Sequence, residues 1–198
     1  MSKTIDVYFD LGSPASYLAW TQLPALAERH QATINWKPML LGGVFKATGN
    51  QSPMATPAKG RYTAVDFMRF AKEYGVPFTL NPHFPINTLQ LMRGAVGYLE
   101  SPRFQDYLTT LFTALWVDKK NLNEPKVVSE VLTDAGFDPA EVLALCNDPA
   151  VKEKLKEITE EAVSRGAFGA PTCFVDNDMF FGQDRLGWVE KALLLQEL

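Results

Sequence analysis

Near the N-terminus, the hydrophobic pattern changes from that of a strand to that of a helix and back. Residues 5–9 form a short apolar run that predicts a buried strand. Apolar residues at helical spacing then predict a helix from Pro14 to about His30, and residues 33–38 predict a second strand that ends at a proline. A strand, a helix and a strand in this order imply two parallel strands joined by a right-handed crossover.

The middle of the chain has a loop-like stretch followed by helical periodicity. Residues 41–63 are rich in Gly, Pro, Ser and Thr, and they predict a loop longer than ordinary connections, a length typical of functional loops. From Val65 to Arg165, apolar residues recur at spacings of three and four, with charged residues between them. This pattern predicts a block of amphipathic helices.

Strand signals return only near the C-terminus. Residues 172–175 and 179–181 flank an Asp-Asn-Asp turn and predict a hairpin. A last helix is expected from about Asp184 to Leu195. Without the helical block, the order is β-α-β followed by β-β-α, which is the order of a thioredoxin-like fold.

The predicted fold class is therefore α/β, a thioredoxin-like fold with a large all-helical insertion. Residues 1–40 and 166–198 are expected to form the thioredoxin-like domain. Residues 41–165 are expected to form the loop and the helical insertion. The length of 198 residues suits one such unit.

Composition narrows the class of protein. The chain is 46% hydrophobic, so it can bury a full core, and its net charge of −4 with no basic stretch argues against a nucleic-acid partner. No apolar run approaches the roughly 18 residues of a membrane span. The start of the chain lacks an apolar signal region, so we expect a cytoplasmic protein.

The cysteines do not form a recognisable site. Cys146 and Cys173 lie far apart and form neither a Cys-x-x-Cys pair nor a metal-binding spacing. His30 and His83 do not complete a zinc site with them, so no metal is predicted. The expectation is two buried thiols in a reducing compartment.

The stretch Ser13-Pro-Ala-Ser16 is the first candidate for chemistry. It follows the first strand and opens the first helix, the place where thioredoxin-like proteins carry Cys-x-x-Cys. Serine cannot exchange disulfides, but a Ser13 hydroxyl at a helix N-terminus can stabilise a thiolate that a cofactor brings. The alternative role for Ser13 is a plain N-cap, with Pro14 at the first helical position. Ser16 is expected to be structural.

The second candidate lies before the late hairpin, where Pro171 begins a strand. Thioredoxin-like folds have a cis-proline there, opposite the active helix, so we predict a cis Ala170–Pro171 bond. We expect Ala170 to face the ligand and to pair with an extended peptide as an added strand would.

Four stretches in this order carry a family resemblance: residues 9–18 (FDLGSPASYL), 46–50 (KATGN), 168–172 (FGAPT) and 182–186 (GQDRL). With them the chain resembles 2-hydroxychromene-2-carboxylate isomerases and kappa-class glutathione transferases, in the DsbA-like branch of the thioredoxin superfamily. The resemblance implies a glutathione-dependent isomerase that acts on an aromatic-degradation intermediate by reversible thiolate addition. It also implies a homodimer. A transferase that conjugates electrophiles and a non-catalytic glutathione or peptide binder remain as alternatives.

The resemblance also implies the site residues, with Ser13 as the catalytic one. The implied glutathione-binding residues are Ser13, Lys59, Ala170, Pro171, Phe181, Gly182, Gln183 and Asp184. The implied substrate-binding residues are Lys46, Asn50, Phe84 and Asn87. Asp184 would face the ammonium of the γ-glutamyl group, and N–H groups of the turn from Gly182 to Asp184 would hold its carboxylate.

Structural alternatives stay open for several of these residues. Asp184 could cap the last helix, Asn87 could cap the helix that follows it, and loop lysines are usually solvated. His83 is expected to be a surface residue, with a base as the alternative, and Arg185 is expected to be a surface or interface charge.

The chain departs from the family pattern at Gly12, Ala15, Ala170 and Gln183, where bulkier, aromatic, valine and asparagine residues respectively are common. We expect the small residues Gly12 and Ala15 to widen the pocket for the second substrate.

Overall fold

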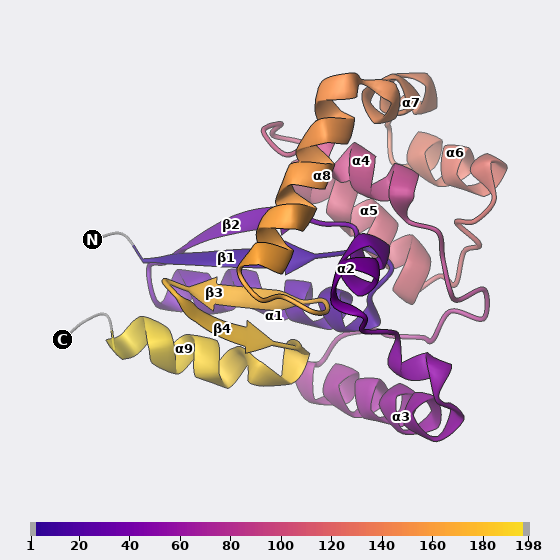
Figure 1. Ribbon diagram of the computed structural model, residues 1–198. Helices are drawn as coiled ribbons and strands as arrows, with labels where there is room; N and C mark the ends of the chain where they lie inside the picture. Colours follow the sequence, from indigo (N-terminus) through magenta and orange to yellow (C-terminus); the bar gives the residue numbers. More distant parts are fainter. Residues whose placement is uncertain (1–2, 196–198) are drawn as a thin grey trace.

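The computed structural model describes residues 3–195 (Figure 1). Four strands form one mixed sheet in the order β2-β1-β3-β4. The strands are β1 (Thr4–Phe9), β2 (Thr33–Pro38), β3 (Thr172–Val175) and β4 (Asp178–Phe181). β1 is parallel to β2 and antiparallel to β3, with Tyr8 opposite Thr172. β1 and the strand at Thr172 thus share one sheet, which agrees with the predicted thioredoxin-like fold.

The sheet has a hydrophobic core on each face. The smaller core lies between the sheet, α1 (Pro14–Arg29) and α9 (Leu186–Leu195). The larger core joins the other face to the helices between β2 and β3, including α8 (Pro149–Ser164), which packs against β2. Figure 1 shows α8 in front of the sheet and α1 behind it.

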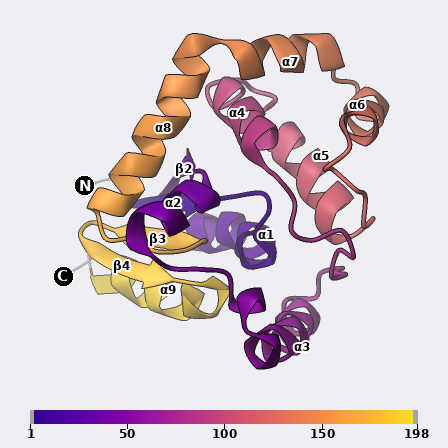
Figure 2. The same ribbon diagram turned by 45° about the vertical axis from the view of Figure 1, so that its right-hand side comes forward.

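The segment between β2 and β3 contains helices joined by loops, and the block of amphipathic helices predicted from Val65 to Arg165 is confirmed. Figure 2 shows α7 at the end of α8 that is distant from the sheet. α4 packs against α7, α8 and β2, and α5 packs against α1. None of the helices in residues 3–195 is both long enough and apolar enough to cross a membrane. The helices before α8 are α2 (Leu41–Thr48), the 3₁₀ turn η1 (Pro53–Ala55), α3 (Pro57–Tyr74), α4 (Leu89–Gly97), α5 (Phe104–Trp116), α6 (Pro125–Asp134) and α7 (Pro139–Asn147).

The prediction of a continuous loop over residues 41–63 is wrong. The segment contains α2, η1 and the first turns of α3. α2 has no side-chain cap of its own, because its N-cap is Leu40. The Leu41 N–H instead donates to the carboxylate of Asp10, 31 residues earlier in the chain. The local sequence therefore carried no start signal, and only the Gly49 C-cap, with φ of 72°, has the usual helix-end chemistry.

The last helix begins two residues later than predicted. Residues Gln183–Arg185 form the short 3₁₀ turn η2, and α9 starts at Leu186. The Asp184 carboxylate pairs with the Arg185 guanidinium and does not cap α9. The turn begins at Gly182, whose φ of 97° suits glycine.

Candidate active site

Ser13 has two roles at the end of β1. Its backbone is extended, and its Oγ accepts the N–H of Ser16 at 3.1 Å, so it is the N-cap of α1. The hydroxyl also donates to the carbonyl oxygen of Ala170 at 3.1 Å, although the two residues are 157 positions apart. Ser13 is therefore both the N-cap of α1 and a direct neighbour of the segment that contains the Ala170–Pro171 bond.

Backbone donors without partners surround this hydroxyl. The N–H of Ala15, in the first turn of α1, has no acceptor within residues 3–195, and neither has the N–H of Ala170. Unpaired N–H groups at a helix N-terminus carry a partial positive charge. The arrangement therefore suits an anionic atom placed beside Ser13.

The start of the hairpin lies next to this group. The Ala170–Pro171 bond is cis, as predicted. The carbonyl oxygen of Pro171 accepts the N–H of Gly182 at 2.9 Å, which joins the start of β3 to the turn after β4. Within the described part of the chain, the N–H groups of Gln183 and Asp184 have no acceptor. They form a second group of free donors, beside the Asp184 carboxylate.

One cavity of about 1200 Å³ connects these groups. Ser13, Ala15 and Ala170 line one side of it, together with residues 181–184. The opposite side consists of α2, η1 and the start of α3. Its large side chains are Leu41, Phe45, Met54, Tyr62 and Phe67, and Phe84 and Ile86 join them from the segment before α4. The cavity therefore has a polar side with free backbone donors and an apolar side formed by these large side chains. The apolar side also carries polar lining residues: Asn50, Gln51, Ser52, Thr56, Lys59, Thr63 and Asp66.

Known proteins share this fold and length. Residues 4–194 match the family model described as a DSBA-like thioredoxin domain. The chain is 32% identical to a 2-hydroxychromene-2-carboxylate isomerase from Sphingobium xenophagum, over 98% of this chain and 100% of that protein. This chain belongs to the DsbA-like family that includes 2-hydroxychromene-2-carboxylate isomerases and kappa-class glutathione transferases.

Two further comparisons agree with this assignment. Glutathione S-transferase kappa 1 from Homo sapiens is 28% identical, over 94% of this chain and 88% of that protein. A solved structure of a 2-hydroxychromene-2-carboxylate isomerase superimposes with a TM-score of 0.84 at 29% identity, covering 98% of this chain and 95% of that one. The recognition made from the four sequence stretches is thus confirmed.

Most residues implied by the family line the cavity. They are Ser13, Asn50, Lys59, Phe84, Ala170, Phe181, Gly182, Gln183 and Asp184. Within residues 3–195, Lys59 is the only lysine or arginine among the lining residues. Pro171 does not line the cavity.

Three polar residues lie differently from the sequence-based expectation. Lys46 is exposed on α2, outside the cavity lining. Asn87 also lies outside it, and its Oδ1 accepts the N–H of Leu89, the first residue of α4. The N-cap of α4 is Thr88, so Asn87 binds the helix start from one residue before the position that the capping alternative gave it. Asn50 does line the cavity, but its Nδ2 donates to the carbonyl oxygen of Phe168 at 2.7 Å, so it joins the two sides.

The expected widening of the pocket at Gly12 is wrong. A Cβ at Gly12 would lie 2.8 Å from Cγ2 of Thr88 and 3.8 Å from the carbonyl oxygen of Ile86. The space that a larger residue would take is therefore already filled. Ala15 lines the cavity, so its small side chain does leave room there.

Sequence reasoning assigned no role to Asp10. This residue is 1% exposed and lines the cavity beside Gly12 and Ser13. Its burial raises the pKa of the carboxyl group, while hydrogen bonds from the Leu41 and Gly12 N–H groups and from Thr88 oppose the rise. The available signal was an acid placed directly after a buried strand, inside the stretch that carries the family resemblance.

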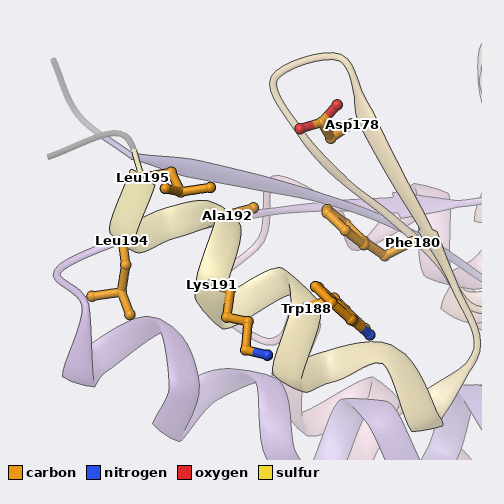
Figure 3. Close-up of a pocket in the computed structure, with 7 residues that line it drawn as sticks. All are labelled: Asp178, Phe180, Trp188, Lys191, Ala192, Leu194 and Leu195. Atoms are coloured by element: carbon orange, nitrogen blue, oxygen red, sulfur yellow. The ribbon is translucent and has the colours of Figure 1, made fainter. Parts of the chain in front are cut away.

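Other chemical groups lie away from this cavity. Cys146 and Cys173 are both free and buried, as expected. Burial raises the pKa of the Cys173 thiol to about 12, which makes it a poor nucleophile. A second hollow of about 640 Å³ lies between β4 and α9 (Figure 3), where Trp188 and Lys191 come from the helix and Phe180 from the strand.

Proposed function

We propose that this protein is a glutathione-dependent isomerase that interconverts 2-hydroxychromene-2-carboxylate and its open-chain isomer. The observation that carries the proposal is the Ser13 hydroxyl, 3.1 Å from the Ala170 carbonyl oxygen and beside two unpaired N–H groups at the cavity. When bound, glutathione supplies a thiolate for reversible addition to the conjugated substrate.

The residues present fit glutathione at the polar side of the cavity. The free N–H groups of Gln183 and Asp184 suit the γ-glutamyl carboxylate, and the Asp184 carboxylate suits its ammonium group. The unpaired N–H of Ala170 suits a peptide carbonyl. Lys59 suits the glycyl carboxylate or an anionic substrate.

Ser13 then acts by donating a hydrogen bond to the sulfur. In the structure, the hydroxyl proton points to the Ala170 carbonyl, and rotation about one side-chain bond redirects it. A hydrogen bond to a charged group contributes about 1.5–3 kcal/mol, and one pKa unit corresponds to about 1.36 kcal/mol. Ser13 would therefore lower the thiol pKa by roughly one to two units, so that a thiol near pKa 8.5 is mostly ionised at neutral pH.

The apolar side of the cavity suits a flat aromatic substrate. Phe45, Phe67 and Phe84 offer ring surfaces, and Asn50 and Lys59 are among the polar lining residues that could meet a carboxylate. Holding the substrate against this side orients its conjugated bond toward the Ser13 turn.

A kappa-class transferase activity is the second candidate. Its support is that one kappa relative, from Caenorhabditis elegans, is 32% identical, the same value as for the Sphingobium isomerase. The deciding experiment is turnover of the chromene with and without glutathione, with free glutathione measured at the end. Turnover that needs glutathione and returns it supports the isomerase, whereas consumption supports the transferase. Glutathione binding with no turnover in either assay would leave a non-catalytic binder.

We also propose a cytoplasmic homodimer. Two free buried cysteines suit a reducing compartment. The dimer rests on the family resemblance, and the exposed apolar surface that includes Trp188, 57% exposed, suits burial in an interface. Sedimentation equilibrium tests the dimer, because a monomer at all concentrations would contradict it.

A further inference from the structure

Asp10 is a buried charge that the proposed chemistry does not use. Among the charged side chains of residues 3–195, Asp10 alone is almost fully buried, with 1% of the residue exposed. An unpaired charge at such a depth is strongly destabilising, so the partners of this carboxylate show why it is there.

The first set of partners belongs to the turn that carries Ser13. Oδ1 of Asp10 accepts the N–H of Gly12 at 2.9 Å, and the backbone oxygen of Asp10 accepts the N–H of Ser13 at 3.0 Å. The side chain and the main chain of one residue thus close the same turn. The position of Ser13 relative to β1 depends directly on Asp10.

The second set of partners belongs to the opposite side of the cavity. Oδ2 of Asp10 accepts the N–H of Leu41 at 2.8 Å, at the first residue of α2. The Thr88 side chain adds a further hydrogen bond to the carboxyl group. One carboxylate therefore connects the Ser13 turn, the start of α2 and the segment before α4.

These contacts need a carboxylate and not merely a polar group. Each of its two oxygens faces a backbone N–H, which can only donate. An asparagine of the same shape has one oxygen, and its NH₂ group would face one of these N–H groups. Either the Ser13 turn or the start of α2 would then lose its acceptor.

We propose that Asp10 is a positioning residue that sets the place of the Ser13 hydroxyl and the separation of the two sides of the cavity. This inference rests on the proposed glutathione chemistry. It predicts that Asp10 affects catalysis through Ser13, so that the two residues are energetically coupled.

The test is a double-mutant cycle of Asp10→Asn and Ser13→Ala. The measurements are kcat/KM with glutathione, the pKa of bound glutathione from ultraviolet absorbance, and thermal unfolding. We expect Asp10→Asn to lower the rate roughly 10- to 100-fold, the scale of a small misplacement. Ser13→Ala should then cost much less in the Asp10→Asn background than in the wild type.

Thr159→Val is the matched control. The Thr159 Oγ1 accepts the N–H of Leu40 at 3.0 Å, next to the Leu41 N–H that Asp10 binds. Within residues 3–195, Thr159 makes no hydrogen bond to the Ser13 turn. It should lower the unfolding temperature while leaving the rate and the thiol pKa unchanged. If Asp10→Asn does not fold, Thr88→Val replaces it, since it keeps the shape and removes one hydrogen bond to the carboxylate.

The outcomes separate the two proposals. Wild-type protein without glutathione-dependent turnover would overturn the proposed function, and with it the Asp10 role. In an active protein, additive effects of the two substitutions would overturn the Asp10 role alone. The same holds if Thr159→Val slows the reaction as much as the Asp10 variant does, because stability would then explain both losses. Strong energetic coupling between Asp10 and Ser13, together with an unchanged rate in Thr159→Val, supports the proposal.

Discussion

The two sides of the cavity are built in different ways. The Ser13 side consists of residues 10, 12–15, 168–170 and 181–184, and the lining residues of the α2–α3 side lie between residues 41 and 67. On the Ser13 side, Asp10, Ser13 and Ala170 are buried and joined by short hydrogen bonds. On the α2–α3 side, most residues are partly or fully exposed, and Val44, Gly60 and Phe67 are its buried members.

This difference matches a division of labour. The Ser13 side presents fixed backbone donors, which suit a constant ligand such as glutathione. The α2–α3 side contacts the Ser13 side through few hydrogen bonds, chiefly those of Leu41 with Asp10 and of Asn50 with Phe168. Its side chains can therefore be exchanged at low cost in stability, which suits a surface that selects the second substrate.

The largest effect is expected for Ser13→Ala. Ser13→Ala removes a hydrogen bond that is donated only to the charged sulfur, so the pKa of bound glutathione should rise. Turnover at neutral pH should slow by roughly 10- to 150-fold, which corresponds to a lost hydrogen-bond contribution of about 1.5–3 kcal/mol. Raising the pH should recover part of the loss, because the thiolate then forms without this donor. A pH–rate profile with ultraviolet detection of the thiolate measures both effects.

Ser16→Ala is the control for Ser13→Ala. The Ser16 hydroxyl is buried, has no partner within residues 3–195 and does not line the cavity. Its removal should leave the pH–rate profile unchanged and stabilise the fold slightly. Equal profiles for wild type and Ser13→Ala would reduce Ser13 to a helix cap and remove the contrast between the two sides.

The next largest effect is expected on the free energy of unfolding, when one glycine from each side is replaced by alanine. A Cβ at Gly12 would contact Thr88 at 2.8 Å, whereas a Cβ at Gly42 would have no neighbour within 4 Å. Gly12→Ala should therefore destabilise the fold by roughly 1–3 kcal/mol, and Gly42→Ala should stabilise α2 by up to about 1 kcal/mol. Urea unfolding measures both. Equal effects would show that the two sides are packed alike.

A smaller effect is expected for the cation of the α2–α3 side. Lys59 lines the cavity and is exposed, so its contact with a carboxylate contributes at most about 1 kcal/mol. Lys59→Ala should raise KM roughly fivefold at low salt, with kcat unchanged, and the effect should shrink in high salt. Lys46→Ala, outside the cavity, is the control. A larger effect at Lys46 would place the anion site elsewhere.

The smallest effect is expected for the link between the two sides. Asn50→Ala removes the exposed hydrogen bond to the Phe168 carbonyl, which contributes about 1 kcal/mol or less. KM for glutathione should rise about two- to threefold, because Phe168 precedes the segment that carries Ala170. Steady-state kinetics with varied glutathione measures it. A fall in kcat without a change in KM would instead indicate a role in the chemical step.

Local patterns in the sequence determined most of the Ser13 side. The strand, the Ser13 cap with Pro14 after it and the hairpin depend on neighbouring residues, and the structure contains each of them. The cis Ala170–Pro171 bond followed from the predicted fold and is also present. The order of these elements was enough to predict the thioredoxin-like fold with its helical insertion. The four family stretches were enough to predict the family.

Tertiary structure alone decided the features that depend on distant partners. α2 begins where the Asp10 carboxylate and the Thr159 hydroxyl accept N–H groups from across the fold, so its own residues contain no start signal. The space at Gly12 depends on Thr88, 76 positions later in the chain. A sequence names the groups that can donate or accept, but only the folded chain decides which groups meet, because burial makes each of them find a partner wherever one lies.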